Sequence, residues 1–402
     1  MAATMEVKPP DELEVPAEDA LDRYQDFRVH MHKRMAEYGI HFGAGYALTV
    51  LGNPVGGAEQ GAAYAGLFGA GLDFNFSRWV DWSDAVFRIS ASWASGDSLT
   101  EEDIRNAIDV SNVYSGRAVR LYELSLRERF FDEALEVKIG RLSVGAHFGI
   151  SPLADAFVNL SFNQNLVALS FNDPAFVADP VSVWGATAAW KPKASAWGAR
   201  FGAFDASDPA QWNENTSGMN FNFNPGAGVL LVGELEARSQ ESLPFLPRPG
   251  QLVAGFFVDT GKRPVLDVPD EEVQGNYNLW LTLQQSLATF RDEGDDLSAF
   301  LTFVGAPRAS LNTFLFSASG GLVWRGWNAA RPEDSWALGV AYYQFSDDLP
   351  GQSYEMAVEL AYTWVATSWL RFQPDIQAVI RPDGRGGIPN AIVAGFAADI
   401  AF

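Results

Sequence analysis

The architecture can be inferred from the stretch SYEMAVELAYTWVATSWLRFQPDIQAVIRPDGRGGIPNAIVAGFAADIAF, residues 353–402, in which apolar and polar side chains alternate. Within residues 354–365, Glu355 and Glu359 share one face. The opposite face carries the apolar side chains Met356, Val358, Leu360, Tyr362 and Trp364. Successive side chains of a strand point to opposite sides of the sheet. The pattern therefore predicts strands that each have one apolar face and one polar face.

The same period of two recurs from residue 39 onward and predicts about sixteen strands. The expected spans are 39–52, 62–77, 85–94, 119–130, 134–141, 181–190, 196–205, 228–237, 251–259, 276–287, 297–306, 312–325, 336–345, 354–365, 369–380 and 391–402. Many of them are close to the length that a tilted strand needs to cross a bilayer. An even number of strands places both ends of the chain on the short-turn, periplasmic side.

The connections between these spans alternate in length. Short ones, such as 131–133, 191–195 and 366–368, are interleaved with longer ones at 95–118, 142–180, 206–227, 260–275 and 381–390. Tryptophan and tyrosine gather at strand ends, as at Trp190, Trp336, Tyr362, Trp364 and Trp369. Both features are typical of an all-β, transmembrane antiparallel β-barrel. A soluble sandwich or propeller has the same alternation and is the less favoured alternative.

Residues 1–38 differ from the rest of the chain. The segment 17–38 is charged, and its apolar residues have a loosely helical spacing. We expect a partly helical arm on the periplasmic side that is able to contact a periplasmic partner, with a flexible polar terminus as the alternative. Residues 1–16 contain no apolar signal segment, so the interpretation requires that a signal peptide has been removed.

Composition excludes several classes of protein. No apolar run is long enough for a membrane-spanning helix. The net charge of −22 disfavours binding to nucleic acid. The chain has no cysteine, and its four histidines are not spaced as metal ligands, so we expect neither a metal site nor a cofactor. Neither a GxSxG nor an HExxH motif occurs, and we do not expect an enzyme.

Residues 353–402 resemble the closing three strands of the carbohydrate-selective porins, the OprB-like family. The shared features are a glutamate-containing strand, the sequence QPDIQ, a Pro/Gly-rich loop and a terminal phenylalanine. Weaker similarities occur at 120–142, 249–261 and 321–345, so that the resemblance covers residues 40–402. It implies a sixteen-stranded barrel, placed in lipid and lipopolysaccharide of the bacterial outer membrane, through which glucose-like sugars diffuse passively.

Strand parity identifies the side chains expected to line the pore. They are Arg88, Glu123, Arg127, Arg129, Glu136, Lys138, Trp280, Glu355, Glu359, Arg371, Gln373, Asp375 and Gln377. A sugar pore needs groups that replace the hydrogen bonds of water. Charges must also face inward, because a midplane Arg or Lys facing lipid costs about 2–4 kcal/mol. We place Tyr122 on the lipid side of its strand, opposite Glu123, and take Trp280 as a candidate stacking surface for sugars. The alternative is that the charges only neutralise one another across a wide lumen.

The connection 142–180 is the longest and is unusually apolar for an exposed loop. We expect it to fold inward as a constriction, with Phe157, Asn159, Phe162 and Asn163 as contacts. An additional strand, or packing on the outer rim, is an equal alternative. Two other functions remain open: a general, cation-preferring diffusion porin, motivated by the net charge of −22, and a barrel scaffold or enzyme with a periplasmic partner.

Overall fold

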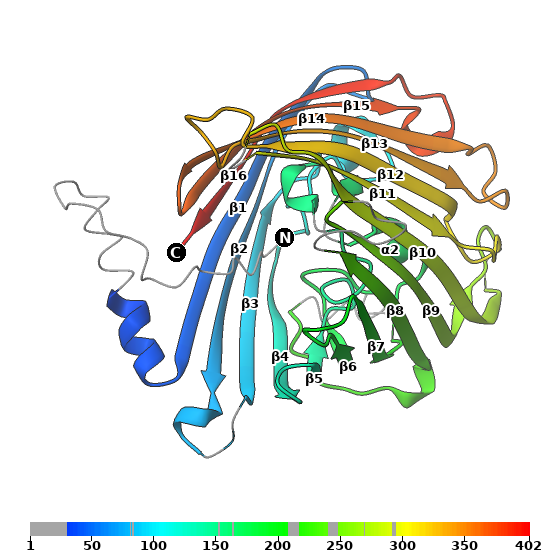
Figure 1. Cartoon of the computed structure of the whole chain (residues 1–402). Helices are drawn as coiled ribbons and strands as arrows, with labels where there is room; N and C mark the ends of the chain where they lie inside the picture. The colour runs from blue at the N-terminus through cyan, green and yellow to red at the C-terminus, as the bar shows by residue number, and fades with distance from the viewer. Residues whose placement is uncertain are drawn as a thin grey trace.

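The computed structural model is a closed barrel of sixteen antiparallel strands, in which β1 pairs with both β2 and β16 (Figure 1). The structure describes residues 30–80, 82, 84–151, 153–162, 165–207, 217–239, 248–268, 270–291 and 295–402. Apart from the β1–β16 pair that closes the barrel, all neighbouring strands are consecutive in the chain, so the barrel is a simple up-and-down meander. The predicted fold class, a sixteen-stranded antiparallel barrel, is confirmed.

The strands are β1 (Ile40–Val55), β2 (Ala62–Asn75), β3 (Val86–Gly96), β4 (Ala118–Phe130), β5 (Leu135–Leu142), β6 (Val183–Trp190), β7 (Trp197–Asp205), β8 (Val229–Ser239), β9 (Gly250–Pro264), β10 (Glu272–Ala288), β11 (Asp296–Gly305), β12 (Phe314–Arg325), β13 (Ser335–Phe345), β14 (Tyr354–Thr367), β15 (Leu370–Ile380) and β16 (Ala391–Ala401). Short helical turns are η2 (Phe76–Arg78), η3 (Thr100–Ile104), η4 (Ala154–Ala156), η5 (Leu160–Phe162), α2 (Val167–Asn172), η7 (Pro225–Ala227) and η8 (Pro382–Gly384). Residues 30–37 are also helical. None of the helices among the described residues is long and apolar enough to cross a membrane.

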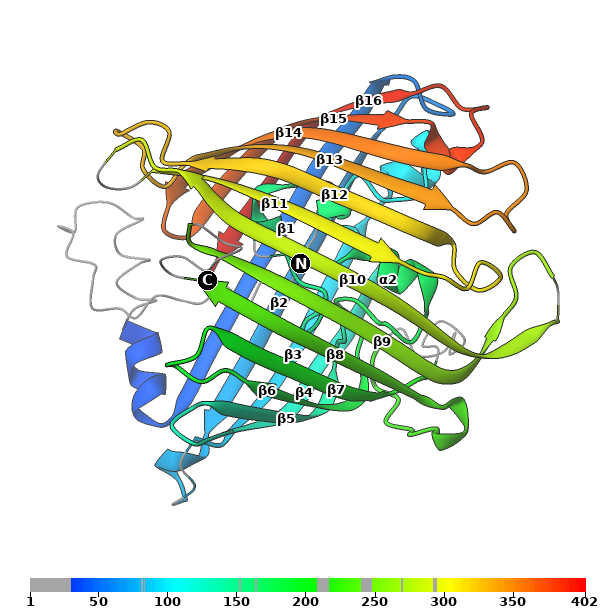
Figure 2. The same cartoon turned by 45° about the vertical axis from the view of Figure 1, so that its right-hand side comes forward.

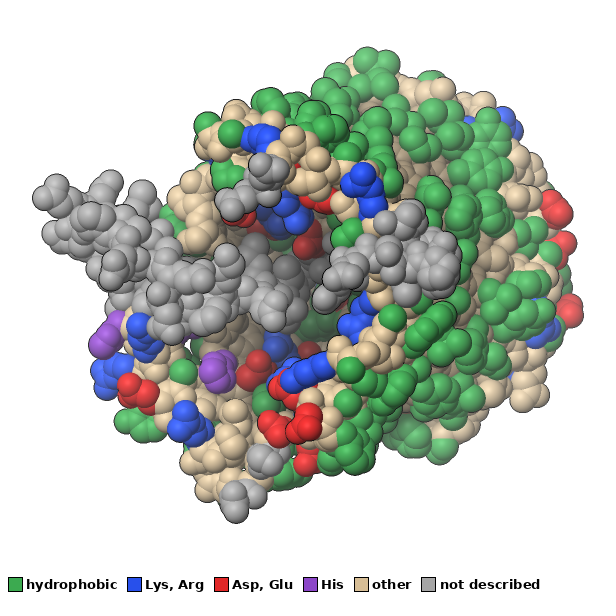
Figure 3. Space-filling view, viewed as in Figure 1, with side chains coloured by type: hydrophobic (Ala, Val, Ile, Leu, Met, Phe, Trp, Pro, Cys, Tyr) green, Lys and Arg blue, Asp and Glu red, His purple; other side chains and the backbone are tan. Residues whose placement is uncertain are grey.

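The barrel wall has two chemically different faces. On β13, Ala337 and Ala341 are buried toward the lumen, whereas Leu338 and Val340 are 48% and 43% exposed on the outside. The same alternation repeats around the barrel, so that hydrophobic side chains cover much of its outer surface (Figure 3). This arrangement leaves few charges on the outer wall and concentrates them in the lumen, as the sequence predicts.

Connections at the two ends of the barrel differ in length. At one end the connections include the short turns 131–134, 191–196 and 368–369, whereas the other end carries 97–117, 143–182 and 206–228. The helix at 30–37 and the carboxyl terminus both lie at the short-turn end (Figures 1 and 2).

Two local expectations about strands are wrong. β9 and β10 remain paired as far as Pro264 and Glu272, so the connection expected at 260–275 is a short turn of 265–271 on a long hairpin. In β4 the register against β3 shifts, because Ser90 pairs with Glu123 while Ala91 pairs with Leu121. The extra residue, Tyr122, forms a β-bulge and points into the lumen rather than toward lipid, where its hydroxyl donates a 2.6 Å hydrogen bond to Asp179.

The largest hydrophobic core lies inside the barrel. Aromatic rings of the loop 143–182 pack against rings from the surrounding strands: Phe148 against Phe204, Phe157 against Phe300, and Phe176 against both Phe257 and Trp280. The loop thus folds inward and carries α2 into the barrel, as both cartoon views show (Figures 1 and 2). Apolar contacts hold it there, because its rings are removed from water on both sides.

Candidate functional site in the barrel lumen

A chain of ion pairs crosses the inner face of β2 to β5. The guanidinium of Arg88 lies 3.1 Å from Asp73 and 3.2 Å from Glu123. Glu123 is also 3.2 Å from the ammonium of Lys138. Four neighbouring strands therefore contribute alternating charges, and each charge has a partner of opposite sign on an adjacent strand.

A second group of ion pairs lies nearer to the short turns. Arg129 contacts Glu136 at 3.0 Å, and Arg127 approaches the same carboxylate at 3.5 Å. Across the β15–β16 pair, Arg371 lies 2.8 Å from Asp399. These residues stand within the first or last part of their strands, which places them in the half of the lumen next to the short turns.

The side chains of these pairs are partly open to the lumen. Their exposed fractions run from 11% for Glu123 and 16% for Lys138 to 36% for Arg129. Charged side chains surround the opening at the centre of the space-filling view (Figure 3). Since each ion pair is partly solvated, it adds little to stability. Its charges do present fixed donors and acceptors to any solute in the lumen.

The other half of the lumen is occupied by the loop 143–182. At one side of α2, the amide of Asn172 donates a 2.8 Å hydrogen bond to Asn278 and accepts one from the N–H of Phe314. The next residue, Asp173, forms a buried ion pair with Arg263 of β9 at 3.1 Å. These contacts tie the middle of the loop to β9, β10 and β12.

Carboxylates on the inner wall accept hydrogen bonds from the backbone of the inward loops. Glu359 accepts the N–H groups of Val158 and Asn159 at 2.6 and 3.1 Å. On β8, Glu234 accepts the N–H of Gly149 at 2.8 Å. Buried backbone N–H groups need such partners, because loops lack the hydrogen bonds of a sheet.

The loop 97–117 also lies inside the barrel and packs on the loop 143–182. The N–H of Asn112 donates to Val158 at 2.7 Å, and the N–H of Leu160 donates to Asp109 at 3.1 Å. Burial raises the pKa of the Asp109 carboxyl from its ordinary 3.8 to about 6, despite hydrogen bonds from Ser98 and the N–H of Ser111. The two loops therefore form one layer that narrows the barrel.

The structure divides the predicted pore residues into two groups. Arg88, Glu123, Arg127, Arg129, Glu136, Lys138 and Arg371 belong to the ion-pair network described above. Glu355, Glu359, Gln373, Asp375 and Gln377 are buried at the boundary between wall and loops. In this second group Gln377 bonds to Asn159 at 2.7 Å and Gln373 to the carbonyl of Asp155 at 3.0 Å.

Trp280 offers no open face to a solute in this structure. It is 4% exposed, the ring of Phe176 meets it edge-on, and its indole N–H donates to Glu234 at 3.2 Å. The expectation of a stacking surface overlooked that the loop covers this position.

Of the loop residues predicted as contacts, Phe157, Asn159 and Phe162 are buried between the loop and the wall. The two rings of Phe157 and Phe162 stack on one another, with centroids 4.6 Å apart. Asn163 lies outside the described residues.

Sequence reasoning missed Glu234, the Asp173–Arg263 pair and the inward course of loop 97–117. Strand parity would have found Glu234, which shares a face with Glu236. The acidic start of loop 97–117 suggests an exposed helix, which hides its inward course. The signal for that course is the set of apolar residues that follow, Ile104, Ile108, Val110 and Val113, all of which are buried.

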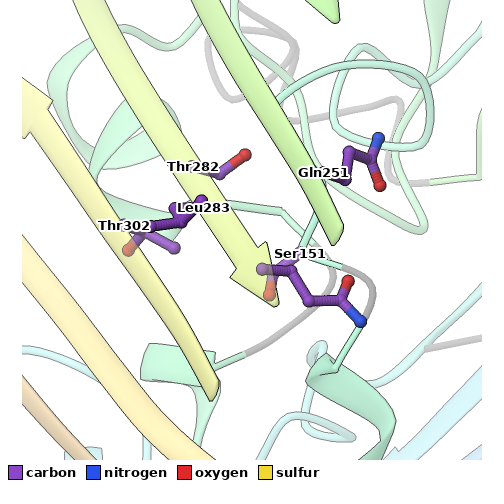
Figure 4. A pocket seen from close by; sticks show the side chains of 6 residues that line it. Ser151, Gln251, Thr282, Leu283 and Thr302 are labelled. Atoms are coloured by element: carbon purple, nitrogen blue, oxygen red, sulfur yellow. The ribbon is translucent and has the colours of Figure 1, made fainter. Parts of the chain in front are cut away.

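A small pocket lined by uncharged residues lies between the loop and the wall. Its lining includes Ser151 from the loop and Gln251, Thr282 and Thr302 from β9, β10 and β11 (Figure 4). The inner surface thus has a charged sector on β2–β5, a second set of charges on β7 and β8 that includes Arg200, Glu234 and Glu236, and a sector of hydroxyl and amide groups on β9–β11.

A closed sixteen-stranded barrel with an apolar exterior, a charged lumen and inward-folded loops defines a diffusion pore of the outer-membrane type. The model of the carbohydrate-selective porin family, OprB, matches residues 59–402, and the chain belongs to this family. Its localisation is accordingly the bacterial outer membrane, and its family is one of channels rather than enzymes.

Individual relatives agree with this assignment. The chain is similar to Porin B of Pseudomonas aeruginosa, with 26% identity over 411 residues that cover 92% of this chain and 88% of that protein. The high-pH structure of Pseudomonas putida OprB has a TM-score of 0.83 at 25% identity and covers 92% of this chain and 96% of that one. The low-pH structure of the same protein matches with a TM-score of 0.62 at 19% identity, covering 97% and 100%, and shows the fold alone.

Proposed function

We propose that this porin passes small neutral sugars through the space between the ion-pair network of β2–β5 and the layer of inward loops. The observation that carries the proposal is the set of partly exposed ion pairs that line one sector of the lumen. Sugar hydroxyls exchange hydrogen bonds with water for bonds to such groups at little net cost. Because each charge is already paired, a free ion gains less from the wall than it loses in hydration.

Within this passage, we propose Arg127, Arg129 and Lys138 as the donors that contact the solute. Their side chains are 28%, 36% and 16% exposed, so each retains N–H groups that face the lumen. Arginine suits this role, because its guanidinium presents several donors in a fixed plane.

We further propose that the short-turn end faces the periplasm and that the long loops face outward, as in other bacterial outer-membrane barrels. The helix at 30–37 then stands beside the periplasmic mouth, where it is able to meet a periplasmic partner; residues 1–29 of the predicted arm lie outside the described residues. The apolar outer wall contacts lipid and, in the outer leaflet, lipopolysaccharide. Solutes leave the pore chemically unchanged.

Liposome swelling tests the sugar preference. Purified protein in liposomes should admit a neutral hexose faster than a zwitterionic amino acid of matched size. Equal rates for the two solutes would contradict the proposal. The alternative is a general cation-preferring pore, which is motivated by the net charge of −22. A reversal potential measured across a salt gradient distinguishes it from a sugar pore. A strong cation preference together with equal swelling rates would establish it.

A further inference from the structure

Two glutamates on the inner face of β14 hold different loops by their backbone. Glu359 accepts the N–H groups of Val158 and Asn159 from the loop 143–182. Four residues earlier, Glu355 accepts the N–H groups of Ala107 and Ile108, at 2.8 and 3.1 Å, from the loop 97–117. β14 therefore bonds to both inward loops.

Glu355 also reaches a third segment. Its carboxylate accepts the N–H of Asp383 at 2.8 Å, in the connection between β15 and β16. Glu355 thus joins two connections that are far apart in the chain. Along a strand, four residues correspond to about 13 Å, so the two glutamates act at two depths of the lumen.

Neither carboxylate belongs to the charged network of the pore. Glu355 and Glu359 are 2% and 0% exposed, and no ion pair joins either of them to Lys or Arg in the described part of the chain. A buried carboxylate must find hydrogen-bond donors to offset the loss of water. Here most of the donors are backbone N–H groups of the loops, beside the side chain of Asn106 at Glu355 and that of Asp375 at Glu359, so the carboxylate and the loop position depend on each other.

We propose that Glu355 and Glu359 are positioning residues that set the width of the pore by fastening the two inward loops to β14. The proposal rests on the porin function for its consequence, but its test reads ionic conductance and so does not depend on which solute the pore prefers. When either carboxylate is lost, the loop it holds swings out of the lumen more often, and the pore alternates between the normal and a wider state.

The substitutions Glu359→Gln and Glu355→Gln test this most directly. Glutamine keeps the size of the side chain, but it replaces one carboxylate oxygen by an NH₂ group. This group is a donor and cannot accept the second backbone N–H of the loop. Because a loop N–H group loses its acceptor, the fraction of time in a wider state should rise about tenfold or more in single-channel recordings. Swelling by a trisaccharide should increase relative to swelling by a monosaccharide.

Glu236→Gln is the matched control. Glu236 is an inward-facing glutamate of β8 with 4% exposure, and its carboxylate contacts the side chains of Lys191, Arg238 and Gln251 at 2.9–3.1 Å. Because these partners are side chains at the wall and not a loop backbone, this substitution should leave the distribution of conductance levels unchanged.

A covalent bridge separates loop position from other effects of the substitution. The chain has no cysteine, so Asn159→Cys with Gln377→Cys introduces the only two thiols, at side chains that are 2.7 Å apart in the wild type. A short bis-methanethiosulfonate linker, which attaches to both thiols through disulfide bonds, should restore the normal conductance distribution of the Glu359→Gln protein, and reduction of those disulfides should bring back the wide state.

An unchanged conductance distribution in both Glu→Gln proteins would overturn the proposal. So would a wide state that persists after bridging, since loop position would then not determine it. The two glutamates hold different loops, so if one variant fails to assemble as a heat-modifiable folded barrel, the other still decides the question. If the Glu→Gln variants change the conductance distribution as expected but the protein shows no sugar preference, only the proposed function is contradicted.

Discussion

Gly339 of β13 lies directly against the ring of Phe157: a β-carbon on this glycine would be 2.8 Å from Cε1 of Phe157 and 2.7 Å from Cζ of Phe162. The loop 143–182 approaches the wall as closely as it does because this position has no side chain. We therefore predict that Gly339→Ala pushes the two rings away from the wall into the lumen and that Gly339→Leu pushes them further, narrowing the pore in that order. Single-channel conductance measures the effect.

The control for this series is Gly305→Ala. Gly305 of β11 has no atom within 4 Å of the position that a β-carbon would occupy. Its conductance should match that of the unmodified protein. If Gly339→Leu conducts no differently from Gly305→Ala, the close approach of loop and wall does not limit the pore.

Trp280 supplies a second prediction. Replacement by phenylalanine removes the indole hydrogen bond to Glu234 and should lower the free energy of unfolding by about 1–3 kcal/mol, because a buried carboxylate loses a donor. Sugar flux at low concentration should stay the same, since the ring is covered by Phe176. The temperature of barrel unfolding on semi-native gels and the concentration dependence of swelling measure the two effects. A weakened apparent sugar affinity without a loss of stability would restore Trp280 as a stacking surface.

Asp109 makes the packing of loop 97–117 dependent on pH. Burial raises the pKa of its carboxyl from the ordinary 3.8 to about 6, so the protonated form is the one that the packed loop favours. The resulting stabilisation is complete below the ordinary pKa and is lost as the pH rises through about 6. We predict stronger protection of the loop amides against hydrogen exchange at pH 5 than at pH 7.5, after correction for intrinsic rates. Asp109→Asn should remove the difference, and a difference that survives in this variant would point to another group.

Arg129 and Glu136 allow the charge of the lumen to be altered in both directions. Removing one unit charge changes the energy of an ion about 4 Å away in water by about 1 kcal/mol, which is about fivefold in relative permeability. Arg129→Ala should therefore raise the cation-to-anion permeability ratio by up to about fivefold, and Glu136→Gln should lower it. Reversal potentials in a salt gradient give both ratios. The same sign of change in both variants would show that these residues do not face the permeating ions.

Strand parity alone was sufficient to place Glu355 and Glu359 on the inner face, because the alternation of β14 runs without interruption. It did not predict their partners, which are backbone groups of loops that lie about 200 to 250 residues away in the sequence. Local sequence patterns carry no information about such contacts. The inward face of β14 was therefore predictable, and its role in holding the loops was not.

Tyr122 and Trp280 show two other limits. A bulge in β4 depends on how β3 pairs with it, and one extra residue reverses the face of every side chain before it, including Tyr122. Trp280 has the predicted orientation, but whether an inward side chain is open or covered depends on the path of a loop from elsewhere in the chain. Both errors concern long-range contacts, whereas the number and order of strands follow from short-range alternation.

The unequal halves of the lumen make the two directions of travel through the pore physically different. An ion that enters by the short turns first meets the paired charges of β2–β5, while one that enters from the opposite side first meets the inward loops, whose interior is a close-packed apolar core. Current–voltage curves of an oriented single channel should then be asymmetric. A bulky charged polymer driven from either compartment should be arrested at a different depth, so that each entrance has its own blocking voltage.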